Sequence, residues 1–142
     1  MALLKKNTDY AVRALLALAS ADGEYLSSRS VAQTQALPYQ FLRSIVRELI
    51  RHGLVISREG AKGGLRLSRD PRKIRVVDVI GIFQGGIELS DCLFRDKLCA
   101  NRSTCVLRKE IVRIEGLVER EFGKLTIQGL LDKMNDAHKG GR

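Results

Sequence analysis

The sequence of 142 residues lacks tryptophan, has only 5% aromatic residues and two prolines, and contains no long hydrophobic run. Its longest apolar stretch, residues 14–19, is far shorter than the roughly 20 residues of a membrane-spanning helix. The start, MALLKKNTDY, shows no extended apolar segment after its lysines and no small-residue cleavage site, so no secretory signal is expected. These absences predict a cytoplasmic protein without a membrane partner.

Signatures of catalysis are also missing. The sequence has no phosphate-binding glycine loop, no H-E-x-x-H motif, and only two histidines from which a Ser-His-Asp set could be built. Three cysteines cannot all pair with one another, and nothing else points to an oxidising compartment. We therefore expect a protein that is not an enzyme and whose thiols are reduced.

Positive charge is abundant and unevenly distributed. Lys and Arg number 25 against 16 Asp and Glu, a formal charge of +9. Residues 1–75 hold 14 basic and 6 acidic side chains (+8), whereas residues 76–142 hold 11 and 10 (+1). With 44% hydrophobic residues the chain can form a folded core. A basic half joined to a neutral half predicts that the first meets a polyanion and the second has another task.

Three helices are predicted in the basic half. Residues 8–20 form an amphipathic pattern with Thr8 as a plausible N-cap, and residues 28–35 form a shorter one that Ser28 can cap. Pro38 follows a tight connection and suits the start of a third helix, over residues 38–52. The apolar stripe of that third helix consists of Phe41, Leu42, Ile45, Val46, Leu49 and Ile50.

A two-stranded hairpin over residues 54–68 follows, because two loosely alternating segments flank a glycine-rich turn. Three helices with a tight turn and then a basic hairpin are the order of a winged helix-turn-helix. In that motif the helix after the turn enters the major groove with its first turns toward the base edges. The predicted DNA-binding residues are Tyr39, Gln40, Arg43 and Ser44 near the bases, Arg47 and Arg51 near phosphates, and Arg58 and Lys62 on the hairpin. The alternative is that this polar helix face is only a solvated surface.

The second half reads as further helices around an irregular segment. Apolar spacing predicts a short helix over residues 76–83, a long one over about 105–122, and a last one over 126–134 before a frayed tail. The apolar seam of the long helix comprises Leu107, Ile111, Ile114, Val118 and Phe122. We thus expect a mainly α fold with a small β-hairpin wing: a winged helix-turn-helix domain (1–75), then a second part (76–142) made of helices around a loop (about 87–105).

All three cysteines lie in or at the end of the irregular segment. Cys92, Cys99 and Cys105 are six and five residues apart, a spacing that fits neither a structural zinc site nor a ferredoxin run. Three thiolates on one loop can still converge on an iron–sulfur cluster, and Cys105 would gain from the dipole of the long helix. Spacing alone leaves open three incidental cysteines, or a cluster-free sensor in which two of them form a reversible disulfide.

The whole chain resembles the Rrf2 family of bacterial transcriptional regulators, which includes IscR-like, NsrR-like and RirA-like members. The matching segments are TDYAVRALLALA (8–19), LPYQFLRSIVRELIRHGLV (37–55), EGAKGGLRL (59–67) and the three cysteines. The resemblance implies a homodimer paired through the long helix, which the seam independently allows. It also implies a four-iron or two-iron cluster on the cysteines, the four-iron form being favoured, and cluster-dependent repression at palindromic operators in double-stranded DNA.

The fourth cluster ligand differs among members of the family. IscR-like proteins place a histidine shortly after the last cysteine, where this chain reads Val106-Leu107-Arg108. NsrR-like proteins use an aspartate from the first helix of the partner subunit, and Asp9 stands at the matching place. The resemblance therefore favours Asp9 over His52 and His138, although Asp9 can also be an ordinary carboxylate at a helix start. IscR carries an acidic residue where this chain has Arg43, so its operator preference is not transferred.

Overall fold

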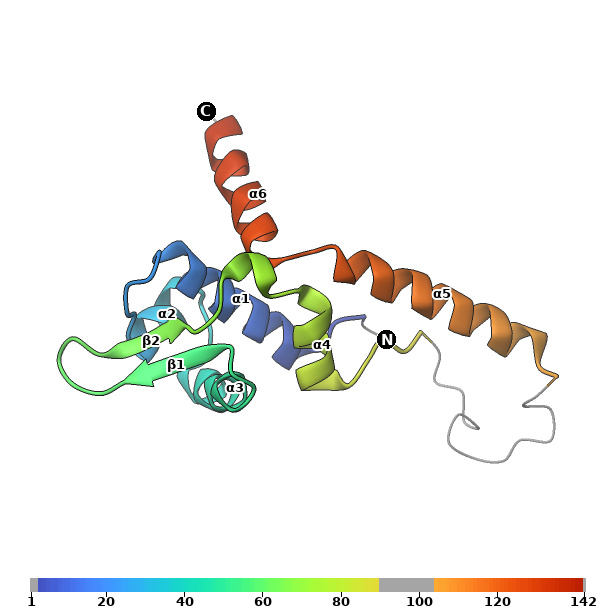
Figure 1. The fold of residues 1–142 in the computed structure, drawn as a ribbon, viewed down its shortest axis with the longest axis horizontal. Coiled ribbons are helices and arrows are strands. Elements are labelled where there is room, and N and C mark those ends of the chain that lie inside the picture. Colours follow the sequence, from blue (N-terminus) through green and yellow to red (C-terminus); the bar gives the residue numbers. More distant parts are fainter. Residues whose placement is uncertain (1–2, 90–103, 142) are drawn as a thin grey trace.

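The computed structural model describes residues 3–89 and 104–141 as a mainly helical chain with one hairpin (Figure 1). This confirms the predicted winged-helix architecture. The elements in order are α1 (Lys6–Ser20), α2 (Ser28–Thr34), α3 (Tyr39–Arg51), β1 (Val55–Arg58), β2 (Gly64–Leu67), the 3-10 helix η1 (Pro71–Lys73), α4 (Val76–Gln84), α5 (Val106–Gly123) and α6 (Ile127–Gly140).

Helices α1, α2 and α3 pack around the main core, to which Leu15, Val31 and Leu42 contribute fully buried side chains. The predicted stripe of α3 is only partly right, because Phe41 and Ile50 are 49% and 38% exposed. A helix lying on a core buries an arc of roughly 100° of its circumference. The other four residues of the stripe fill that arc, and Phe41 and Ile50 fall at its two edges.

Both predicted N-caps are wrong. Helix α1 begins earlier, with Lys5 as its N-cap residue, so Thr8 lies inside the helix and is completely buried. Its hydroxyl donates a hydrogen bond to Gln84 Oε1 at 2.7 Å. Helix α2 is capped by Ser27, whose side chain accepts from the backbone N–H of Ser30 at 3.1 Å. Local capping preferences therefore misplaced both helix starts. Thr8 makes a tertiary hydrogen bond and not a cap, and the cap of α2 lies one residue earlier than predicted, at Ser27.

The hairpin forms as predicted, with β1 and β2 antiparallel and Val55 opposite Leu67. A third segment joins it, because Leu26 and Leu65 exchange backbone hydrogen bonds of 2.9 and 2.7 Å. Gly64 has φ +139°, and a Cβ atom there would overlap the carbonyl oxygen of Leu26. The glycine is thus required for the close approach that fixes the wing against residues 25–26.

Helices α4 and α6 of the second half pack against α1 of the first half. Val76 and Ile80 of α4 form a small core with the C-terminal part of α5, and Ile127 of α6 is fully buried in the main core. The N–H of Ile127 donates to the carbonyl of Ile74 at 2.9 Å. Helix α6 packs against α1, so residues on both sides of position 75 share one core. The predicted domain boundary at residue 75 therefore stays a prediction about the division of function.

Helix α6 runs on to Gly140, six residues past the predicted end, so the frayed tail is wrong for residues 135–140. The apolar pattern stops near Met134, but backbone hydrogen bonds extend a formed helix without further burial. No helix in the described ranges combines the length and apolar character of a membrane span.

Candidate functional site

The exposed face of α3 presents the predicted DNA-binding residues to solvent. Gln40, Arg43, Ser44 and Arg47 are exposed, and Tyr39 at the first helical position is 36% exposed. The Ser44 hydroxyl donates to the carbonyl of Phe41 at 2.9 Å, which leaves its oxygen as an acceptor. This arrangement fits a reading helix whose N-terminal half faces base edges.

Arg51, farther along α3, is less available for DNA than predicted. Its Nη2 atom lies 2.8 Å from Glu48 Oε2, one turn back on the same helix. By contrast, Arg43 and Arg47 form no ion pair with any residue that the structure describes. The arginines of α3 without an ion pair among the described residues therefore lie before its last turn, at positions 43 and 47.

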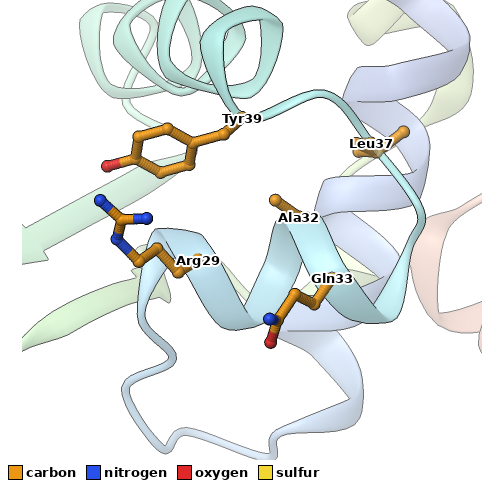
Figure 2. Close-up of a pocket in the computed structure, with 5 residues that line it drawn as sticks. All are labelled: Arg29, Ala32, Gln33, Leu37 and Tyr39. Atoms are coloured by element: carbon orange, nitrogen blue, oxygen red, sulfur yellow. The ribbon is translucent and has the colours of Figure 1, made fainter.

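An arginine that sequence reasoning missed lies beside the reading helix. The guanidinium group of Arg29 in α2 stands over the Tyr39 ring, 4.8 Å from its centroid (Figure 2). Both line a pocket of about 230 Å³ together with Ala32, Gln33 and Leu37, between α2 and the start of α3. The signal available in the sequence was the position of Arg29 in the first turn of α2, the helix that crosses the DNA backbone in this motif.

The wing carries its predicted basic residues. The Arg58 guanidinium donates to the carbonyl of Lys62 at 2.8 Å, across the tip of the hairpin. It also stacks over the Tyr25 ring at 4.0 Å, and Arg66 approaches the same ring at 4.7 Å. Tyr25 lies before α2 in the sequence, so its contact with the wing could not be found without the fold.

Asp9 lies in the first turn of α1 and is 45% exposed. Its carboxylate pairs with Arg13 Nε at 3.1 Å, one turn along the helix. The start of this helix is held by Gln84, whose Oε1 accepts from the N–H of Lys5 at 3.0 Å as well as from Thr8. Asp9 is thus an accessible carboxylate on a fixed helix start.

Of the three cysteines, the structure describes Cys105, and Cys92 and Cys99 lie outside the described residues. Cys105 is the partly exposed N-cap residue of α5, with a free thiol. Nothing within residues 3–89 and 104–141 groups three or more histidine, cysteine or acidic side chains in a way that could hold a metal.

Both histidines have partners inside their own helices. His52 Nδ1 lies 3.0 Å from the carbonyl of Glu48, and His138 Nδ1 lies 2.7 Å from that of Met134.

Helix α5 extends away from the body of the molecule, at the end opposite the wing (Figure 1). None of its 18 residues is buried. The predicted seam is divided, because Val118 and Phe122 pack against α4 whereas Leu107 and Ile114 are 67% and 40% exposed. Additional exposed apolar residues that the seam did not include are Val106, Val112 and Leu117.

Comparison with known proteins gives one consistent result. The model of the Rrf2 family, described as an iron-dependent transcriptional regulator, matches residues 4–133. The transcriptional repressor NsrR of Streptomyces coelicolor is 32% identical over 130 residues, covering 90% of this chain and 87% of its own.

Two solved structures share the fold. IscR of T. potens has 27% identity and a TM-score of 0.71, and the match covers 94% of this chain and 89% of that one. CymR, the global cysteine regulator of B. subtilis, has 27% identity and a TM-score of 0.74, with 94% and 98% covered.

Proposed function

Because this chain belongs to the Rrf2 family of transcriptional regulators, we propose that it is a dimeric repressor whose operator binding is controlled by an iron–sulfur cluster. Its relatives are DNA-binding regulators, and the chain is accordingly a regulator and not an enzyme. The main support for a cluster is that all three cysteines lie within residues 92–105, directly before α5.

DNA is the polyanion that the basic half meets. The exposed residues Tyr39, Gln40, Arg43 and Ser44 are proposed to face base edges, with Arg47, Arg58 and Lys62 on the phosphate backbone. An arginine or glutamine placed on a base edge contributes about 1–3 kcal/mol of discrimination. The formal charge of +8 on residues 1–75 supplies the attraction that does not depend on sequence.

The residues present fit an iron–sulfur cluster as donors. We propose Cys92, Cys99 and Cys105 as thiolate ligands, with Asp9 of the partner subunit as the fourth ligand. Cys105 precedes the first turn of α5, where unpaired N–H groups and the helix dipole favour a thiolate. Asp9 is exposed enough to exchange its pairing with Arg13 for an iron atom. When bound, the cluster would supply a centre that reacts with oxygen or nitric oxide, or is lost under iron scarcity.

The proposed homodimer is supported by the exposed half of α5. Leu107, Ile114 and Leu117 lie along a helix that its own chain leaves uncovered. Pairing of two such helices would bring two winged helices to the half-sites of a palindromic operator, about one DNA turn apart. We propose that the same pairing brings Asp9 of one subunit to the cysteine segment of the other.

Loss of the cluster is proposed to weaken operator binding by changing the spacing of the two reading helices. A tenfold to hundredfold change in affinity requires about 1.4–2.8 kcal/mol of coupling, which is ordinary for an allosteric protein. The second candidate function is a cluster-free thiol sensor. It is favoured by the similarity to CymR, which is described as the global cysteine regulator of B. subtilis.

Anaerobic purification separates the two candidates. We expect a brown protein with stoichiometric iron and sulfide, and operator affinity at least tenfold higher for the loaded than for the stripped form. A colourless protein that binds DNA differently when oxidised than when reduced would support the thiol sensor and overturn the cluster.

Single substitutions test the ligands. Cys99→Ala and Cys105→Ala should abolish the visible absorbance, and Thr104→Ser, next to Cys105, should retain it. Asp9→Ala should leave the absorbance initially present but speed its decay in air, without weakening DNA binding by the loaded form. Full colour in a cysteine variant, or an unchanged decay rate for Asp9→Ala, would remove that residue from the ligand set.

A further inference from the structure

One face of the wing carries two arginines and a tyrosine in contact. The Arg58 guanidinium lies 4.0 Å and that of Arg66 4.7 Å from the centroid of the Tyr25 ring. Both distances are well inside the roughly 6 Å over which a cation is attracted to an aromatic face. A single ring therefore holds two cations that come from different strands.

The register of the hairpin explains why these side chains meet. Val55 and Leu65 point into the core and are almost fully buried, so alternate residues point to solvent. Ile56 pairs with Arg66, which places Arg58, two residues along, on the same outward face as Arg66. Leu26 forms an antiparallel bridge with Leu65, so residue 25 lies opposite Arg66. The Tyr25 side chain is therefore on the same outward face as Arg66.

Without the ring, the two guanidinium groups would tend to separate. Like charges on one sheet face repel each other, and both side chains have many rotamers when free. Within the described residues neither arginine has a carboxylate partner, in contrast to Arg51, Arg72 and Arg75. Tyr25 is only partly exposed and is anchored through its neighbour Leu26, so it provides a fixed surface for both.

We propose that Tyr25 is a positioning residue that holds Arg58 and Arg66 as one preformed site for phosphate groups of duplex DNA. The inference rests on the proposed contact of the wing with DNA, and it adds Arg66 and Tyr25 to that contact. A guanidinium stacked by its flat face keeps N–H groups at its edge available for phosphate, and Arg58 offers those that it does not already donate to the Lys62 carbonyl. Prior placement of both groups lowers the ordering cost of binding.

Measurement of DNA affinity as a function of salt tests the site. Arg58→Ala and Arg66→Ala should each weaken specific and random duplexes alike, and each should reduce the salt slope by about 1. Tyr25→Leu should weaken binding about threefold to tenfold with the slope unchanged, because the phosphate contacts remain but are no longer prearranged. Tyr25→Phe keeps the ring and should bind as the wild type does.

A mutant cycle separates positioning from direct contact. In the Arg58→Ala, Arg66→Ala background, Tyr25→Leu should cost nothing further. An equal loss in both backgrounds would overturn the inference, as would normal binding by Tyr25→Leu beside weakened arginine variants. Thermal unfolding of each variant shows whether it still folds. If Tyr25→Leu does not fold, the DNA affinity of Tyr25→Phe is compared with that of the wild type in its place. If both arginine variants bind normally, the proposed wing contact itself fails.

Discussion

The neighbours of each arginine determine whether its charge is available to DNA. Arg51 is paired with Glu48, and Arg72 makes a bidentate contact with Asp70, whose pKa it lowers from 3.8 to about 2. Among described residues, Arg43 has no such partner and lies on the exposed face of α3. The formal charge therefore overstates the number of cations free for a nucleic acid, and Arg43 is among the most available.

Arg43→Ala should weaken operator binding by about 1–3 kcal/mol and weaken random duplex binding much less, because a base-edge contact exists only on the correct sequence. Titrations of operator and scrambled duplexes at one salt concentration measure both losses. Arg51→Ala is the matched control and should change neither binding constant by much, since its guanidinium is held by Glu48. Equal losses on both duplexes would make Arg43 a phosphate contact.

At the scale of elements, Gln84 joins segments that are far apart in the sequence. Its Oε1 accepts from the N–H of Lys5 and the hydroxyl of Thr8, and its Nε2 donates to the carbonyls of Leu3 and Gly86. The end of α4 is thereby tied to the start of α1, beside Asp9. Because the chain leaves α4 toward its own cysteines, this connection links the segment proposed to hold one cluster to the Asp9 proposed for the cluster of the partner subunit.

Gln84→Leu should lower the free energy of unfolding by about 1–3 kcal/mol, because the completely buried Thr8 hydroxyl loses its partner. Adding Thr8→Val should recover part of that loss, since replacing both partners removes the unsatisfied group. Urea denaturation measures both effects. Gln128→Leu, in which a bond within α6 to Asp132 is lost, is the control and should be nearly neutral. Equal stability of Gln84→Leu and wild type would contradict this account.

At the scale of the whole molecule, the wing and the exposed part of α5 lie at opposite ends (Figure 1). One exposed apolar residue of α5, Leu117, lines a hollow of about 410 Å³ together with Leu3, Phe122 and others. A second subunit that covers these surfaces would leave both wings free for DNA. This separation of assembly from DNA binding suits a regulator that joins two half-sites.

Ile114→Glu should weaken self-association by at least roughly tenfold, because a buried unpaired carboxylate costs more than 1.4 kcal/mol. Sedimentation velocity over a range of concentrations measures the shift toward monomer. Lys109→Glu, also exposed on α5, controls for the change in charge and should remain associated. An unchanged dimer in Ile114→Glu would place the interface elsewhere.

The sequence predicted the elements well and their contacts less well. The tight turn, the helix that follows it and the hairpin are confirmed, because apolar periodicity and turn residues are local signals. Local signals did not predict the surroundings of Thr8, Phe41 and Tyr25. A threonine near a helix start suggests a cap, and only the packing of α4 on α1 shows that its hydroxyl is directed to Gln84.

The sequence by itself determined the order of the helices, the basic first half and the placement of three thiols in one segment, since all of these follow from residue type and spacing. Only the tertiary structure decided which cations remain free, which apolar residues of α5 stay uncovered and which ring holds the wing arginines. Those properties depend on segments separated by tens of residues, and no local pattern records which distant segment will pack beside another.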